Sequence, residues 1–313
     1  MPSALATSWP RALVGVTCLV VAISLAGCGR LGFDAAGGDA AGFDGTSGDA
    51  VDACTWSTWG APTVLSNLST PGGAWAPTLA ADGLTVVFSS DRAGGTGGID
   101  LYMASRASID APFGPATELA QLDTASADDS AALTADGLTL YLTSDRGGSD
   151  RLYRATRASP QDVFGPPSIV GELASEEVAG PAISADGAEL FYTQRFAGYL
   201  RIMRSQASGG VFMPPRPVTE LDVPLQDEGY PSLASDHLAL YFMRIGPGDP
   251  GDLVVATRPS RDGAFGPAVP LDEVNTVNKE DDPLISFDGT TLMWVSTGAS
   301  PKPELVMTTR TCR

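Results

Sequence analysis

The sequence predicts an all-β protein in which one structural unit is repeated five times. Three observations carry this prediction. An aspartate that opens a tight turn recurs at positions 82, 136, 186, 236 and 288, at spacings of 54, 50, 50 and 52 residues. A short β-prone run follows each aspartate, and each unit also contains a segment that opens with an aromatic residue and a nearby proline. Units of this length, with four short strands each, are typical of the blades of a β-propeller.

Each unit accommodates four strands. The first is a brief strand before the aspartate turn, and the second follows it, because glycine after aspartate permits the positive φ of a hairpin turn. The predicted second strands are Leu84–Ser89, Leu138–Thr143, Leu190–Thr193, Leu238–Met243 and Thr291–Ser296. A third run follows a loop, and the fourth strand is the aromatic-proline segment. The fourth turn has His237 in place of glycine, and we interpret this histidine as a surface turn residue rather than a base or a metal ligand.

The two ends of the repeat region complement each other. An aromatic-proline segment beginning at Trp59 precedes the first turn, and the last unit stops after its third strand, around 304–309. Pairing the two completes a fifth blade and removes two exposed strand edges. We therefore predict a single five-bladed propeller of four-stranded antiparallel blades over residues 53–313, with the N-terminal strand completing the last blade.

The first residues resemble an export signal. Arg11 is the only charge before a largely apolar run over 12–25, which is shorter than the ~20 residues that a transmembrane helix needs. The run ends in Leu25-Ala26-Gly27-Cys28, which resembles the lipobox of bacterial lipoproteins. The resemblance implies a signal peptide over 1–27, lipidation of Cys28 and a location in the cell envelope. Gly29 after the cysteine favours anchoring in the outer membrane, with the protein facing either the periplasm or the cell surface. A plain secretory signal or an uncleaved anchor is the alternative.

The segment over 28–52 is predicted to be a flexible tether, because glycine, alanine and aspartate dominate it and little apolar surface is available for a core. Its aspartates lack the spacing of an EF-hand loop. The chain carries a formal charge of −18. This charge argues against nucleic acid as a partner, and we expect contact with the membrane through the N-terminal lipid only.

The cysteines support ring closure. Cys18 leaves with the signal peptide and Cys28 is lipidated, which leaves Cys54 just before the first strand and Cys312 just after the last one. The start of one antiparallel strand lies beside the end of its partner, so we predict a disulfide between Cys54 and Cys312 in an oxidising compartment. Two free thiols are the alternative.

Two of the units resemble a known repeat. Ala81-Asp82-Gly83, Ser90-Asp91-Arg92 and Asp100-Leu101-Tyr102 in the first unit, and Ser144-Asp145-Arg146 in the second, are similar to the PD40 or WD40-like repeats of TolB and related envelope proteins. The resemblance covers roughly residues 59–310 and implies the propeller fold. It implies little about function, because propellers host many activities.

Acidic clusters precede the predicted inner strands, at the mouth of the channel. The candidate binding face contains Asp128, Asp129, Glu176, Glu177, Asp227, Glu228, Glu280, Asp281 and Asp282, together with Arg92 and Arg146. One interpretation is that these acids and arginines neutralise each other or cap backbone amides. The other is a face that binds a cationic or polar ligand, or a protein. Trp75 and Tyr230, near the same loops, could stack on a ligand or pack between blades. No cluster of cysteine and histidine offers a zinc site, and we expect no metal and no cofactor.

Three functions are consistent with these features. The first is a monomeric, non-catalytic binding module for an envelope protein, peptide or glycan. The second is a glycan-processing enzyme that uses paired carboxylates at the channel mouth, as five-bladed glycosidases do. The third is a purely structural envelope component. A deep, solvent-filled channel with two carboxylates ~5–10 Å apart would favour the enzyme, and a plugged channel would favour the binding module.

Overall fold

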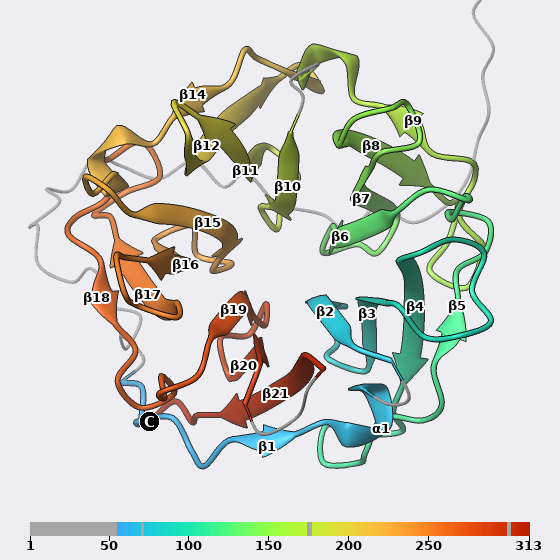
Figure 1. Ribbon diagram of the computed structural model, residues 1–313, viewed down its shortest axis with the longest axis horizontal. Coiled ribbons are helices and arrows are strands. Elements are labelled where there is room, and N and C mark those ends of the chain that lie inside the picture. Colours follow the sequence, from blue (N-terminus) through green and yellow to red (C-terminus); the bar gives the residue numbers. More distant parts are fainter. Residues whose placement is uncertain (1–54, 70–71, 174–176, 299–301) are drawn as a thin grey trace, which may run out of the picture. The chain divides into compact units, whose positions relative to one another are not determined.

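The computed structural model describes residues 55–69, 72–173, 177–298 and 302–313, which form five antiparallel sheets around a central axis (Figure 1). Each sheet corresponds to one predicted repeat, and we number the sheets blades 1 to 5 in chain order. The predicted signal peptide, 1–27, and tether, 28–52, lie outside the described residues. No helix within the described ranges is long and apolar enough to cross a membrane.

Blades 1 and 2 each contain four strands in chain order, with the first strand innermost. Blade 1 consists of β2 (Ala74–Leu79), β3 (Thr85–Ser90), β4 (Asp100–Ser105) and β5 (Thr117–Glu118). Blade 2 consists of β6 (Asp128–Leu133), β7 (Thr139–Ser144), β8 (Arg151–Thr156) and β9 (Ser168–Ile169). The outermost strand is only two residues long in both blades.

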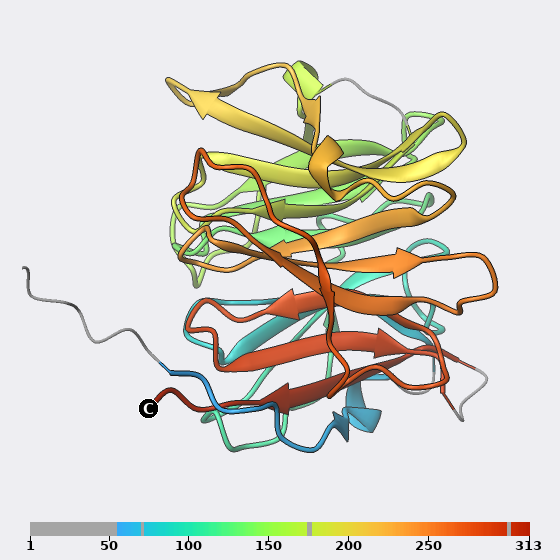
Figure 2. The same ribbon diagram turned by 90° about the vertical axis from the view of Figure 1, so that its left-hand side faces the viewer.

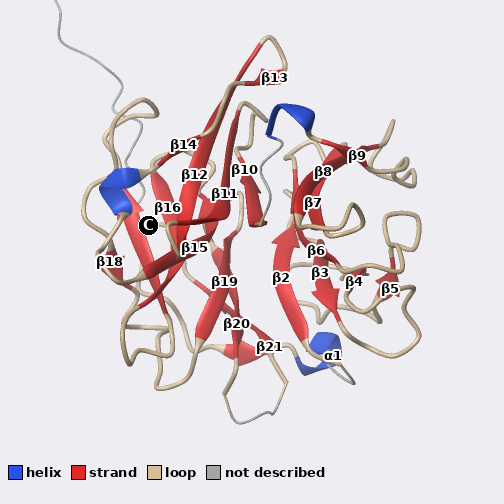
Figure 3. Ribbon diagram, turned by 45° about the horizontal axis from the view of Figure 1, so that its top comes forward, coloured by secondary structure: helices blue, strands red, loops and turns tan. Residues whose placement is uncertain are grey.

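Blades 3 and 4 keep this order. Blade 3 consists of β10 (Val178–Ile183), β11 (Glu189–Phe196), β12 (Tyr199–Ser208) and β14 (Arg216–Pro217), and β13 (Val211–Phe212) also pairs with the end of β12. Blade 4 consists of β15 (Asp227–Leu233), β16 (Ala239–Ile245), β17 (Asp252–Thr257) and β18 (Val269–Pro270). The remaining elements are the short helices α1 (Ser66–Ser69), η1 (Gly171–Leu173) and η2 (Thr219–Leu221). The all-β character of the chain is evident in Figure 3.

Blade 5 joins the two ends of the repeat region. Its inner three strands are β19 (Glu280–Ile285), β20 (Thr291–Ser296) and β21 (Glu304–Thr309), and its outer strand is β1 (Thr63–Val64). Thr63 pairs with Met307, so the N-terminal strand completes the last blade. The N-terminal and C-terminal segments lie side by side in Figure 2. The predicted five-bladed propeller and its mode of closure are confirmed.

The predicted disulfide cannot be followed completely, because Cys54 lies outside the described residues. The next residue, Thr55, exchanges two 3.0 Å backbone hydrogen bonds with Arg313, and Trp56 pairs with Cys312. Cys54 therefore precedes by two residues the position that pairs with Cys312, and the disulfide stays a prediction.

The aspartate turns have the same geometry in all five blades. The aspartate carboxylate accepts a hydrogen bond from the backbone N–H two residues later, at 2.8 to 3.1 Å. The residue directly after each aspartate has a positive φ, which glycine adopts without strain. His237 takes this place in the fourth turn, with a φ of 64°. The prediction of a surface histidine needs correction, because its side chain is only 17% exposed and turns toward Glu189.

The inner strands narrow the channel. Each is interrupted by a bulge, where one residue adopts a positive φ and the register shifts. The bulge residues are Ala76, Ser130, Gly180, Tyr230 and Asp282. Proline follows in four of the five blades and interrupts the ladder there, because it has no N–H to donate. The bulges therefore place one residue of each blade at the channel wall.

Candidate functional site

The face predicted from the sequence carries the loops before the inner strands and the loops between the second and third strands. We call it the entry face. The two loops meet in blade 1, where the backbone N–H of Gly73 donates to Asp91 at 2.7 Å. Most of the sequence-predicted acids on this face fall into two sets with different surroundings.

The first set occupies the start of three inner strands and is fully buried. Asp128, Glu228 and Glu280 each accept a hydrogen bond from the loop that precedes their own strand, from the backbone N–H of Thr124, Val223 and Thr276, respectively, at 2.5 to 3.1 Å. Asp128 also pairs with Arg146. Glu228 pairs with Arg201 at 2.8 Å and with Arg244 at 3.4 Å. These carboxylates fix the loops and have no free face toward a ligand.

Three of the four arginines near this face have a common structural role. The guanidinium groups of Arg92, Arg146 and Arg244 donate to the carbonyl oxygens of Leu68, Leu122 and Leu221, respectively, which occupy equivalent positions before the inner strands. Each guanidinium also lies over an aromatic ring, at 4.5 to 5.4 Å for Tyr102, Tyr153 and Phe242. Arg195 differs, because its guanidinium donates to the carbonyl oxygen of Gly198 within its own hairpin, at 3.3 Å.

The second set consists of Asp129, Asp281 and Asp282 and lies at the channel. Asp282 closes the seam between blades 5 and 1, where its Oδ2 accepts a hydrogen bond from the backbone N–H of Ala76 at 3.0 Å. The bulges of blades 2 and 4 use a hydroxyl from the preceding blade instead, Ser89 at 3.1 Å and Thr193 at 2.7 Å. Blade 5, which precedes blade 1 around the ring, has Val295 at the position of Ser89 and Thr193 and so offers no hydroxyl there. The Asp282 carboxylate accepts the hydrogen bond from the blade 1 bulge instead.

The charges of the second set disfavour one another. Burial, followed by the negative charges of Asp281 and Asp129, raises the pKa of Asp282 well above its usual range. Burial and the same three carboxylates raise the pKa of Tyr230, whose ring packs against Gly180 of the neighbouring blade 3. Lys279 forms an ion pair with Asp281 at 2.5 Å. This group of acids is therefore only partly neutralised.

The remaining predicted acids are dispersed. Asp227 accepts from the backbone N–H of Leu200 at 2.7 Å. Glu177 is exposed, and Glu176 lies outside the described residues. Burial, followed by the charges of Asp145, Asp129 and Glu177, raises the pKa of the exposed Asp150, which places Asp150 in the same electrostatic group. The open acidic part of the entry face thus consists of Asp150 and Glu177, with the half-buried Asp129 near them, and we call these three the rim acids.

The channel below the rim is narrow. The five bulge residues, with the residue that follows each, enclose a cavity of about 30 Å³, the space of one water molecule, and a second cavity of about 60 Å³ lies beneath it. The channel is therefore constricted by the proline-bearing bulges and by Tyr230.

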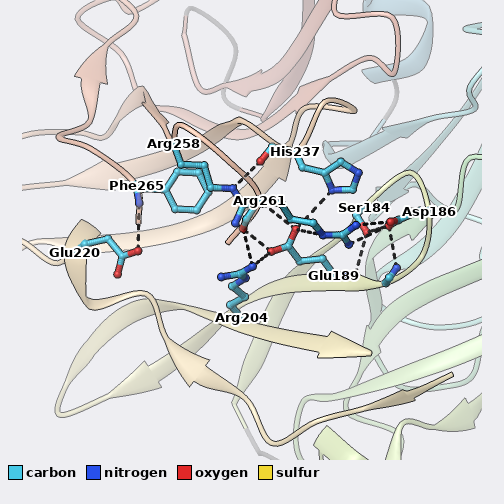
Figure 4. A network of polar contacts seen from close by, with 10 residues as sticks. Ser184, Asp186, Glu189, Arg204, Glu220, His237, Arg258, Arg261 and Phe265 are labelled. Carbon is cyan, nitrogen blue, oxygen red and sulfur yellow. Dashed lines mark hydrogen bonds and ion pairs between the residues drawn. The ribbon is translucent and has the colours of Figure 1, made fainter. Parts of the chain in front are cut away.

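A buried ion cluster lies at the end of the strands opposite the entry face (Figure 4). It was not predicted from the sequence. Glu189, at the start of β11, is fully buried and accepts from both terminal nitrogens of Arg258, at 3.1 and 2.8 Å. Arg204 also pairs with it, and Arg261 and His237 lie 3.6 Å from its Oε2. The cluster joins blade 3 to blade 4 and saturates the carboxylate.

Comparison of the five units shows a sequence signal that could have indicated this ion cluster. The other blades have threonine or alanine where blade 3 has Glu189. They also have an arginine after the third strand that donates to the turn carbonyl, as Arg258 does to His237 at 2.6 Å. Ala207 takes that place in blade 3. Glu189 thus departs from the repeat where the arginine is also lost.

One group of three acids has the spacing of a metal site within the described ranges. One oxygen each from Asp100, Glu118 and Asp123 lies within 4.8 Å of the others. None of the three was a predicted site residue, because they come from three separate segments of blade 1.

No protein-family model matches the sequence, and no curated protein matches it. Solved structures match the fold. The α-L-arabinofuranosidase PaAbf62A from Podospora anserina has a TM-score of 0.54 at 15% identity, with 82% of this chain and 97% of that chain covered. A thermostable family-43 glycoside hydrolase has a TM-score of 0.53 at 11% identity, with 78% and 90% covered. TolB from Acinetobacter baumannii has a TM-score of 0.49 at 12% identity; the alignment covers 78% of this chain and 56% of the length of TolB. The likenesses to the two glycoside hydrolases establish the fold alone.

Proposed function

We propose that the chain is a lipoprotein anchored in the cell envelope, and that its propeller is a non-catalytic binding module for a protein, peptide or glycan. The observation that supports this most is the state of the channel. The carboxylates at the start of three inner strands are engaged by their own loops, and the channel cavity has room for about one water molecule. A glycosidase requires two free carboxylates on either side of a sugar.

The rim acids are the proposed contact surface. Asp129 and Asp150 lie close enough to Tyr230 to raise its pKa, and Asp129 and Glu177 interact in the same way with Asp150. Their charge adds to that of a chain with a formal charge of −18, which attracts cations and repels anions. A basic segment of an envelope protein, docked over the mouth, fits this surface best.

A glycan-processing enzyme is the second candidate, and two observations favour it. The likeness to glycoside hydrolases of families 43 and 62 extends over 78 to 82% of the chain. The pKa of Asp282 is raised by burial and by neighbouring carboxylates. A raised carboxyl pKa is the property that a general acid needs at neutral pH.

One set of variants separates the two candidates. The purified chain is screened against peptide and glycan arrays and against a panel of arabinofuranoside and xyloside substrates. We expect binding of basic peptides that weakens at least tenfold in a D129N/D150N/E177Q variant and weakens with salt, without turnover of any sugar. The matched control D262N changes an exposed acid on another surface and should bind like the wild type. Sugar turnover that is abolished by D129N or D282N would overturn the binding proposal.

A further inference from the structure

Three acidic side chains of blade 1 converge away from the channel. Asp100 begins β4, Glu118 ends β5, and Asp123 lies in the loop that leads to blade 2. An oxygen of each lies within 4.8 Å of the others, and Asp100 and Asp123 are buried. Among the ion pairs of the described residues, none joins a lysine or an arginine to any of the three. Three negative charges thus lie together without a counter-charge.

Asp123 has an oxygen with no partner. Its Oδ1 accepts from the backbone N–H of Leu101 at 3.1 Å, whereas its Oδ2 is buried without a hydrogen bond, in a residue that is 9% exposed. The equivalent residue of blade 4, Asn275, accepts from the N–H of Leu253 at 2.9 Å and donates to its carbonyl at 3.0 Å. The asparagine amide can accept from the backbone N–H and donate to the backbone carbonyl at this position, whereas a carboxylate can only accept. Asp123 therefore requires a cation or a proton.

The loop between β3 and β4 holds two of the three carboxylates in position. The backbone N–H of Gly97 donates to Asp100 at 2.7 Å, and Thr96 donates to Glu118 through its N–H at 2.9 Å and its hydroxyl at 2.5 Å. A Cβ atom on Gly97 would collide with the carbonyl oxygens of residues 124 and 126. The absence of a side chain at position 97 therefore brings this loop close to the backbone near Asp123.

From this geometry we propose that Asp100, Glu118 and Asp123 bind one divalent cation, with Ca²⁺ preferred. Carboxylate oxygens are the ligands of hard cations. Ca²⁺ binds oxygens at 2.3–2.6 Å, so ligands on opposite sides of one ion lie ~5 Å apart, and the 4.8 Å limit fits within that span. Mg²⁺ demands a tighter octahedron, at 2.0–2.1 Å. Water and nearby backbone carbonyls complete the coordination.

The site is specific to blade 1. The residues of the other blades at the position of Glu118 are Ile169, Pro217, Pro270 and Val64. One ion per propeller is therefore expected. The ion would hold the loop between β3 and β4 against β5 and against the segment that leads to Asp128 and the rim acid Asp129. Calcium would thus order one side of the channel mouth.

A proton is the competing occupant of Asp123. Burial, followed by the charges of Asp100 and its acidic neighbours, raises the pKa of Asp123 to about 8. Calcium binding should therefore displace protons and tighten as the pH rises.

The test measures the melting temperature and the calcium stoichiometry of the purified full chain at pH 8. EDTA, CaCl₂ and MgCl₂ form the three arms, and isothermal titration calorimetry gives the number of ions. We expect Tm to rise by about 5–10 °C at a calcium concentration of 100 times Kd, with a smaller effect of magnesium. The D123N variant reproduces Asn275, so it should fold in EDTA at least as stably as the wild type and lose the calcium response.

A matched control and a second variant keep the outcome decisive. Asp252 starts the third strand of blade 4, as Asp100 does in blade 1, but the positions of Glu118 and Asp123 are occupied there by Pro270 and Asn275. D252N should keep the full calcium response. E118Q changes a position that tolerates isoleucine and proline in other blades, so it should fold and bind calcium at least tenfold more weakly. The proposal is overturned if calcium leaves the wild type unchanged, or if D123N and E118Q respond as the wild type does. Those results would mean that a proton, and not a cation, satisfies the Oδ2 of Asp123.

Discussion

Arg258 in blade 4 and Glu189 in blade 3 form a bidentate ion pair in which neither side chain reaches solvent, with nitrogen–oxygen distances of 3.1 and 2.8 Å. A planar guanidinium matches a carboxylate in this way better than a lysine would. Arg204, Arg261 and His237 surround the same carboxylate, so one negative charge compensates several buried or half-buried donors.

Loss of the Glu189 charge should therefore destabilise the joint between blades 3 and 4. E189Q leaves Arg258 buried without a counter-ion, and breaking such a pair costs about 3–5 kcal/mol. Urea unfolding followed by tryptophan fluorescence measures the effect. D262N, which changes an exposed acid near Arg261, is the control and should alter the free energy of unfolding by less than about 0.5 kcal/mol. Equal stabilities of E189Q and the wild type would contradict a structural role for the cluster.

The pKa of Asp282 predicts how stability depends on pH. Because burial and Asp281 raise its pKa in the folded state, the native chain holds this proton at a pH where the unfolded chain releases it. The contribution is complete below pH ~4, the unfolded value, and is lost as pH rises through the folded pKa. D282N keeps an oxygen for the N–H of Ala76 and removes the charge. We expect its unfolding free energy to fall less than that of the wild type between pH 5 and 8, by about 1.4 kcal/mol per unit of pKa shift. Parallel pH profiles would refute this assignment.

Two glycines with positive φ should respond differently to alanine. Gly187, in the third aspartate turn, has a φ of 70° and open space where a Cβ would lie. G187A should cost only the backbone strain, about 1–2 kcal/mol. Gly180, at the bulge of blade 3, has a φ of 52°, and its Cβ would lie 2.8 Å from the Tyr230 ring and 3.0 Å from its Cα. G180A should destabilise more than G187A in the same unfolding assay, and the reverse order would show that the channel wall yields easily.

The disulfide prediction has a direct measurement. Mass spectrometry of the exported protein under non-reducing conditions should find a peptide that links Cys54 to Cys312. C312S should then lower stability by up to about 5 kcal/mol on the chain-entropy model, because the bond closes a very long loop. Alkylation of both thiols without prior reduction would contradict the prediction.

The blade architecture could be predicted from the sequence because local signals repeat. Each aspartate turn fixes a hairpin, and a missing fourth strand at one end matches an extra strand at the other. The entry face was also predictable, since Asp128 and Glu280 occupy the same position of two units. What these acids bind was not predictable. Asp128 accepts from Thr124, four residues earlier, and that contact depends on how the loop folds back.

Register explains other differences. Asp227-Glu228 looks equivalent to Asp128-Asp129 in the sequence, but Glu228, opposite Arg244, corresponds to Asp128, opposite Ser144. Side chains alternate along a strand, so an offset of one residue exchanges a loop-fixing acid for one with a different partner. The Asp100, Glu118 and Asp123 group was missed because a strand start, a strand end and a loop converge only after the sheet has formed.

The pairing of β1 with β21 also determines how the propeller would respond to mechanical load. If the chain is held by its N-terminus, a pull reaches the ring first at Thr55 and Trp56, which pair with Arg313 and Cys312, and then at the seam between β1 and β21. A covalent bond from Cys54 to Cys312 would bypass that seam and pass the force to the C-terminal strand. The other four blades would then carry no load.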